Sequence, residues 1–291
     1  MKNMKKITGL WVISVAVMAF VACEPVENRE EMKGATTMDK INQYVKVEQE
    51  IRDGKKSNFF SLSSDHLDAL SSFSYGIGTY AGTNTNGYIQ CFVVSGDQEI
   101  VFTALNADGT KLTKTFPVTI DECFDVAPEW ELLCGEGSKV WTWDTSAPAY
   151  YGNGGYLVHT VPTWWMVSSF ADQGGLHYDG EGEGATMTFS ATGAKFTKNK
   201  TDGSTESGTF SFDMSKTKIN SDGNALWSIG QLTTSQIVVL NGWNGNDNDD
   251  NGKAVYVYDI LLLTDTEMVL GNPITGAEAW DTCIYWVFRA E

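Results

Sequence analysis

The fold is decided by the stretch IVFTALNADGTKLTKTFPVTI, residues 100–120. Apolar and polar residues alternate through Ile100–Leu105 and again through Phe116–Ile120, as in antiparallel strands that bury one face. Between them, Asn106–Gly109 ends in an Asp-Gly pair, which supplies the positive φ that a tight hairpin turn requires. The stretch therefore predicts a β-hairpin.

Similar alternation continues on both sides of this hairpin. The clearest further runs are Tyr88–Phe92, Thr186–Ala191, Thr209–Met214 and Ile284–Phe288. Turn signals separate them, for example Asn153–Gly155, Asp202-Gly203 and Asp222-Gly223. We expect about eight strands in the second half of the chain, which form either an antiparallel β-barrel or a β-sandwich. The predicted fold class is all-β. Met38–Asp53 fits a short amphipathic helix and a strand equally well.

The amino terminus has the pattern of a bacterial lipoprotein signal. Three lysines precede the apolar run Ile7–Ala22, which is shorter than the roughly 20 residues that a spanning helix needs. Residues 1–22 are therefore predicted to be a signal peptide, with Cys23 as the lipidated residue. The alternatives are an ordinary signal peptide or an uncleaved anchor. Residues 23–44 begin charged and poor in apolar side chains, as expected of a tether.

Charge and cysteine content narrow the classes of function. The chain has 37 acidic and 20 basic residues, and it lacks the clustered Lys and Arg with which proteins bind nucleic acid. Four cysteines besides Cys23 form an even set that fits an exported protein, and they allow three disulfide pairings. Buried free thiols are equally compatible with the pattern. The four are Cys91, Cys123, Cys134 and Cys283.

Two segments of the first half resemble a known domain family. Phe73–Gly78 and the pair Val101–Gly109 with Phe116–Ile120 are similar to the aromatic-Gly turn and last hairpin of PKD-like, immunoglobulin-type domains. The resemblance implies a β-sandwich over residues 45–124 that acts as a spacer. Asp121–Pro128 is the predicted boundary, and every tryptophan except Trp11 follows it.

The second half, residues 125–291, resembles the lipocalin-like and related all-β domains of surface lipoproteins from the glycan-uptake systems of gut anaerobes. The resemblance is carried by Trp130–Leu133, Lys139–Asp144, Thr186–Phe189 with Thr209-Phe210, and Tyr258–Leu270. It implies a lipid-anchored protein at the outer membrane, facing the cell exterior, with polysaccharide or oligosaccharide as ligand and transporter components as further partners.

Tryptophans in loop-like contexts are the best functional clue. Indole faces stack on sugar rings, and neighbouring amides can bind the hydroxyls. We therefore predict a glycan platform drawn from Trp164, Trp165, Trp243 and Trp280, with Asn241 and Asn244 beside them. The alternative is that these rings hold loops onto the β domain. Trp130, Trp227 and Trp286 lie in alternating apolar runs and are expected in the core.

One acidic loop matches the first half of a calcium-binding loop. Asp247–Gly252 reads DNDDNG, so the predicted calcium ligands are Asp247, Asp249 and Asn251. The second half of the motif fails, because Tyr258 stands where a bidentate Glu belongs. The alternative is a solvated hairpin loop. Asp179, Glu181 and Glu183 form a second candidate cation site, and no cofactor besides calcium is predicted.

No enzymatic signature is present. The chain has no Gly-x-Ser-x-Gly elbow, His-Glu-x-x-His motif, phosphate loop or dinucleotide fingerprint. A glycoside hydrolase built on two of Glu129, Glu131, Glu181 and Glu183 is the enzymatic alternative. The sequence and its resemblances predict a surface lipoprotein that captures polysaccharide for uptake. An adhesion or structural protein-interaction lipoprotein and a lipocalin-like carrier of a small ligand are the alternatives.

Overall fold

The computed structural model describes residues 35–82, 85–172, 179–246 and 252–291. Cys23 and the predicted calcium ligands Asp247, Asp249 and Asn251 lie outside these residues. The protein is all-β, as predicted, with 51% of residues in strands and 8% in helices. No helix in the described part of the chain is long and apolar enough to cross a membrane.

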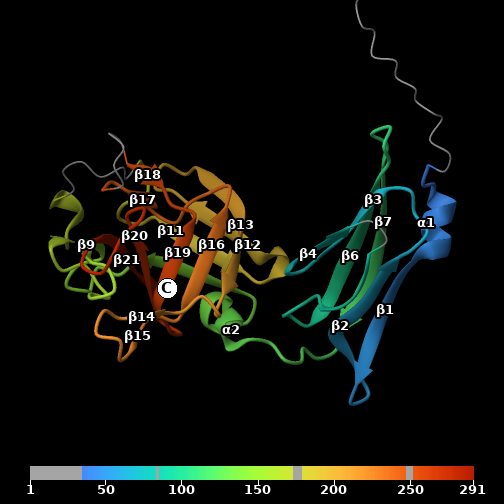
Figure 1. The fold of residues 1–291 in the computed structure, drawn as a ribbon, viewed down its shortest axis with the longest axis horizontal. Helices are drawn as coiled ribbons and strands as arrows, with labels where there is room; N and C mark the ends of the chain where they lie inside the picture. The colour runs from blue at the N-terminus through green and yellow to red at the C-terminus, as the bar shows by residue number, and fades with distance from the viewer. Residues whose placement is uncertain (1–34, 83–84, 173–178, 247–251) are drawn as a thin grey trace, which may run out of the picture. The chain divides into compact units, whose positions relative to one another are not determined.

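The first half forms two antiparallel sheets, drawn in blue to green in Figure 1. The three-stranded sheet contains β1 (Val45–Arg52), β2 (Lys55–Ser64) and β5 (Asn86–Gln90). The four-stranded sheet contains β4 (Gly78–Gly82), β3 (Leu70–Tyr75), β6 (Gly96–Leu105) and β7 (Lys111–Ile120). Their inner faces share one core that includes Phe60, Phe73 and Phe102.

The hairpin that opened the sequence analysis is present. Strands β6 and β7 pair from Gly96 opposite Ile120 to Leu105 opposite Lys111, and Gly109 in the turn has φ of 86°. The segment that fitted both helix and strand contains both: α1 (Met38–Tyr44) runs directly into β1. Ile41 is fully buried, and Tyr44 packs against the same core, so both residues anchor the short helix.

The second half closes into an eight-stranded antiparallel barrel, which decides between the two predicted architectures. Its strands are β8 (Ser138–Trp143), β11 (Thr186–Ser190), β12 (Lys195–Asn199), β13 (Thr205–Asp213), β16 (Gly230–Ser235), β19 (Val257–Leu263), β20 (Glu267–Pro273) and β21 (Thr282–Ala290). Each pairs with the next in chain order. Pairing of Phe288 with Trp143 joins β21 to β8 and closes the barrel.

Large aromatic side chains fill the barrel. Trp141, Phe189 and Trp286 are fully buried within one hydrophobic core. Strand β21 is buried on both faces over most of its length. Outside the eight-strand ring, β14 (Lys218–Ile219) and β15 (Leu226–Ser228) form a small separate hairpin, and its Trp227 joins the same core.

One segment of the second half forms a helix, and one turn predicted there is wrong. Trp130–Leu133 belongs to α2 (Pro128–Cys134), a helix with proline in its first turn, where the ring of Trp130 packs on Phe210 and Phe212. Asn153–Gly155 is not a turn: it ends β9 (Tyr151–Gly155), which pairs with β21 and carries β10 (Trp165–Val167) on its other edge.

Chain order determines which connections share an end of the barrel. Because successive strands are antiparallel, the connections β8–β11, β12–β13, β16–β19 and β20–β21 all leave the same end. We call this end the mouth. The first connection contains β9 and β10, and the third contains β17 (Trp243–Asn244) and β18 (Lys253–Ala254).

The four described cysteines are free thiols, so no disulfide pairing occurs among them. Burial raises the pKa of the Cys91 and Cys134 thiols to about 12 and that of Cys123 to about 11. Cys283 is fully buried, and burial raises its pKa as well. These side chains therefore act as small apolar residues.

Candidate functional site

Two exposed tryptophans, one from the β8–β11 connection and one from the β20–β21 connection, converge on one histidine. The rings of Trp164 and Trp280 each lie 5.8 Å from the ring of His159, at interplanar angles of 88° and 84°. Trp164 is 50% exposed and Trp280 is 59% exposed, so both present much of a large aromatic ring to solvent. We call these three residues the aromatic cluster.

Gly155 lies beneath the aromatic cluster. A Cβ atom at this position would lie 3.2 Å from Trp164 Cζ2 and 3.4 Å from Trp280 Cε3, so the glycine lets both rings lie close to the backbone. The backbone N–H of Gly155 donates to His159 Nδ1 at 2.8 Å. Because Nδ1 accepts this bond, the imidazole is in a neutral form with its proton on Nε2.

Buried donors fix the backbone that carries the cluster. The carbonyl of His159 accepts from Trp227 Nε1 at 2.6 Å and from the Tyr285 hydroxyl at 3.0 Å. The same hydroxyl reaches the carbonyl of Gly155 at 2.9 Å. Burial raises the pKa of Tyr285, so this group stays a neutral donor. Trp227 of β15 and Tyr285 of β21 thus hold the backbone of the aromatic cluster in place.

The backbone of Trp280 is held in an uncommon conformation. Its φ is 74°, in the left-handed region that large residues rarely adopt. Its N–H donates to the carbonyl of Tyr156 at 3.0 Å, and the N–H of Tyr156 donates to the carbonyl of Asp281 at 2.7 Å. Such strain persists only where surrounding contacts impose it, and it is concentrated at functional sites.

The other two predicted platform tryptophans lie apart from the cluster. Trp165 is 40% exposed and packs edge-on against Tyr151, with ring centroids 5.8 Å apart. Trp243 is half-buried, and its carbonyl accepts a bond from the Tyr151 hydroxyl at 3.1 Å. Tyr151 thus lies between these two residues, whereas His159 gathers Trp164 and Trp280.

The predicted amides are interior groups. Asn244 is fully buried, and its Nδ2 donates to Asn272 Oδ1 at 2.9 Å. Asn241 is 1% exposed, and its carbonyl accepts from Trp286 Nε1 at 3.0 Å. Both residues therefore hold the β16–β19 connection in place, and neither borders the aromatic cluster on the surface.

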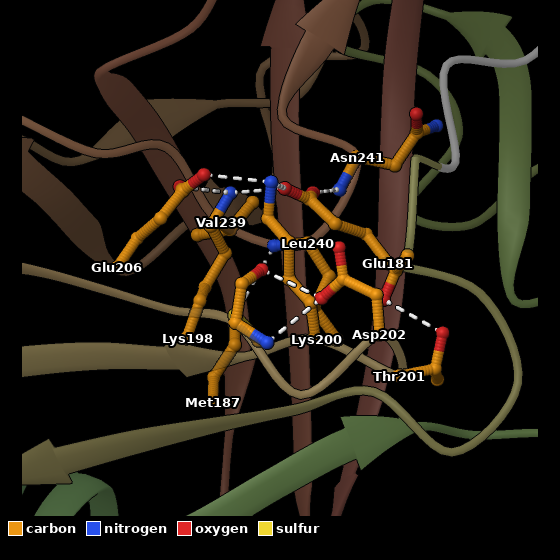
Figure 2. Close-up of polar contacts among 12 residues, drawn as sticks. Glu181, Met187, Lys198, Lys200, Thr201, Asp202, Glu206, Val239, Leu240 and Asn241 are labelled. Atoms are coloured by element: carbon orange, nitrogen blue, oxygen red, sulfur yellow. Dashed lines mark hydrogen bonds and ion pairs between the residues drawn. The ribbon is translucent and has the colours of Figure 1, made fainter.

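A buried ion-pair network occupies another part of the mouth, as Figure 2 shows. The carboxylate of Glu181 contacts Lys198 and lies 3.2 Å from Lys200 Nζ. Glu206 binds the same two ammonium groups, at 3.1 and 2.6 Å. The side chain of Lys198 is only 2% exposed. Glu181, one of the three acids of the second candidate cation site, is thus already paired with two lysines.

The network also fixes the β16–β19 connection over the barrel. Glu181 Oε2 accepts from the backbone N–H of Asn241 at 2.7 Å (Figure 2). The adjacent Leu240 N–H lies 3.3 Å from Met187 Sδ, and the N–H of Val239 donates to the Tyr258 hydroxyl at 3.2 Å. The connection therefore plugs the mouth, and a ligand inside the barrel would have to displace these buried groups.

Hydrogen bonding shifts the pKa values of the outer pair in this network. For Lys200, the bond to Glu206 raises the pKa. For Glu206, burial alone would raise the pKa, but the bonds from Lys200 and Lys198 outweigh it and lower the pKa. Both groups are therefore charged near neutral pH. Among the described residues, no group of three or more His, Cys, Asp or Glu side chains could hold a metal ion.

Sequence reasoning missed His159 and Lys198. No periodic pattern marks His159, although it lies five residues before Trp164 and four residues after Gly155, the last glycine of β9. Lys198 is a buried position of β12, two residues after Phe196, but in the sequence it looks like an ordinary polar strand residue. No protein-family model matches the chain, and no curated protein is detectably similar to it in sequence.

Proposed function

We propose that this protein binds a glycan on the aromatic cluster. The observation that carries the proposal is the convergence of two half-exposed indoles on His159 above Gly155. The C–H face of a sugar ring packs on an indole, and two adjacent indoles offer room for neighbouring sugar units. The exposed carboxylates of Glu278 and Asp281, beside Trp280, are available to accept bonds from hydroxyl groups.

The mode of binding is surface capture and not enclosure. A filled barrel with a plugged mouth favours an external platform over a lipocalin-like carrier of a small ligand. Long, flexible polysaccharides suit such an open platform, because they can bind without entering a cavity. Captured glycan would then pass to a neighbouring transporter.

Surface display is the second part of the proposal. It rests on the lipoprotein signal that ends at Cys23 and on the acidic tether behind it. Acylated lipoprotein is retained by membranes, since several acyl chains anchor where one is marginal. Cys23→Ala should move the protein from the membrane fraction to the soluble fraction, and protease added to intact cells should cleave the wild type. Unchanged membrane retention of the variant would contradict the anchor alone.

Affinity electrophoresis of the full chain in detergent tests glycan binding. Gels would contain neutral, basic or acidic polysaccharides, and at least one should retard the protein. Trp164→Ala and Trp280→Ala should each weaken retardation about tenfold, which corresponds to roughly 1.4 kcal/mol. Trp165→Ala is the matched control, since it removes an indole that is 40% exposed and lies outside the cluster. The proposal would be contradicted if no polysaccharide retarded the protein, or if both cluster variants were retarded as strongly as the wild type.

A specific observation favours one rival, a protein-docking lipoprotein. Val161 and Met166 are each 47% exposed and extend the apolar surface alongside Trp164 and Trp165. Protein interfaces use broad apolar areas, whereas a sugar platform needs only its rings. Met166→Lys should therefore leave glycan retardation unchanged. A loss of retardation as large as that of Trp164→Ala would indicate a broader contact surface.

A further inference from the structure

The segments that build the aromatic cluster carry no positive charge. Residues 144–172 and 274–281 contain neither Lys nor Arg, while they include Glu278 and Asp281. Both of these carboxylates are exposed, and they flank the exposed ring of Trp280 in the same turn. The backbone N–H of Glu278 donates to Asp281 Oδ2 at 2.7 Å, which keeps the two acids close together.

The groups at the centre of the cluster are also unfavourable to anions. Indole faces carry negative potential and attract cations, with Trp the strongest of the aromatic residues. His159 accepts a bond at Nδ1, which only the neutral ring can do. Nothing in the described cluster therefore offers a negatively charged ligand an ionic partner.

Lys218, a basic residue next to Tyr156 behind the cluster, is paired with an acidic side chain. Lys218 Nζ lies 5.1 Å from the centre of the Tyr156 ring and 2.7 Å from Asp259 Oδ2. The side chain of Asp259 is 3% exposed and that of Lys218 is 30% exposed, so this pair is partly shielded from solvent. Its charge is thus matched inside the protein and adds little attraction for an anion outside it.

We propose that the aromatic cluster selects glycans by charge and takes those whose sugar units carry positively charged amino groups. The inference rests on the proposed glycan-binding function and names its ligand class. The ammonium group of such a glycan would lie over an indole face and near Glu278 and Asp281. Uronic and sulfated glycans would be rejected, because their charges would meet like charges.

Titration calorimetry with three hexasaccharides tests this selection at pH 7.5 and 20 mM salt. The probes are a glucosamine hexamer with trimethylated amines, whose charge is fixed, the N-acetylglucosamine hexamer, and a galacturonic acid hexamer. The cationic hexamer should bind about fivefold more tightly than the acetylated one, from exposed cation–π contact and nearby carboxylates. At 500 mM salt the carboxylate part of this preference should be screened. The acidic hexamer should not bind.

A charge-matched pair of variants assigns the preference to its source. Glu278→Gln with Asp281→Asn should lower the preference for the cationic over the acetylated hexamer to about twofold, because the amides still accept bonds from hydroxyl groups but carry no charge. Asp265→Asn with Glu267→Gln removes the same charge at the β19–β20 turn, outside the aromatic cluster, and should preserve the preference. Equal binding of the cationic and acetylated hexamers, or binding of the acidic one, would overturn this inference while leaving glycan binding intact. If none of the three hexamers bound, the proposed ligand class would be overturned. If no polysaccharide in the gel experiment retarded the protein, the proposed function itself would be overturned.

Discussion

The barrel interior and the loops at its mouth use the same residue type in opposite ways. Each fully buried indole donates its Nε1–H to a backbone carbonyl: Trp141 to Leu133, Trp143 to Glu181, Trp227 to His159 and Trp286 to Asn241. Trp164, Trp165 and Trp280 make no such bond to any described residue and are at least 40% exposed. Satisfied indoles build the fold, and unsatisfied ones are free to bind a ligand.

The sharpest test of this comparison exchanges one indole from each region for alanine. Trp286 is fully buried and meets the rings of Tyr151 and Tyr258 edge-on. Trp286→Ala should lower the free energy of unfolding by about 3–5 kcal/mol, through lost burial and a cavity. Trp280→Ala should change it by no more than about 0.5 kcal/mol. Urea denaturation followed by circular dichroism measures both. Similar losses for the two variants would erase the distinction between structural and exposed indoles.

An intermediate effect is expected for the charge inside the mouth. Lys198→Met leaves Glu181 buried with one ammonium partner fewer, which should lower the free energy of unfolding by about 3 kcal/mol. Lys198→Met with Glu181→Gln removes both charges, and the glutamine retains an acceptor for the N–H of Asn241. The double variant should therefore recover at least about 1 kcal/mol.

The control for this pair lies on the same strand. Lys195 is exposed on β12, so Lys195→Met should change stability by less than about 0.5 kcal/mol. A Lys198→Met variant as stable as Lys195→Met would mean that the buried network does not hold the β16–β19 connection. Denaturant midpoints of all three variants, measured in one buffer, decide between these outcomes.

The smallest effect is expected at a charged turn of the mouth. Asp202 accepts bonds from the hydroxyl and N–H of Ser204, and these bonds lower its pKa below the usual 3.8. A lowered pKa in the folded state stabilises the protein above about pH 4, and this contribution is lost as pH falls through the folded value. Asp202→Asn should therefore reduce the urea midpoint slightly at pH 7, and the difference should shrink at pH 3. A difference that grows in acid would contradict this assignment.

Local features of the fold were predictable, and closure of the barrel was not. Ile100–Ile120 predicts its hairpin because alternation and an Asp-Gly turn act within 21 neighbouring residues. The choice between barrel and sandwich depends on Trp143 meeting Phe288, a pairing that no local pattern encodes. Asn153–Gly155 misled for a physical reason: its glycines serve close packing under His159 and not a turn.

The candidate site was predicted in part. Exposure of Trp164 and Trp280 follows from their loop contexts, but their meeting at His159 requires two connections far apart in sequence to converge. Asn241 and Asn244 look like surface amides by composition. They are buried because the β16–β19 connection turns into the mouth. There the N–H of Asn241 donates to Glu181, which lies in the β8–β11 connection. Lys198 was missed because its partner Glu181 lies in the β8–β11 connection, away from Lys198 in the sequence.

Strand β21 has a consequence for folding, because the barrel cannot close without it. Its residues Thr282–Trp286 pair with β9, and its residues Phe288–Ala290 pair with β8. These are contacts between the last residues of the chain and segments that are synthesised far earlier, and such distant pairings slow folding. Tyr285, which holds the backbone of His159, lies on the same strand. A ribosome-bound or truncated chain that lacks β21 therefore has neither the closed barrel nor the hydroxyl group that holds the backbone of His159.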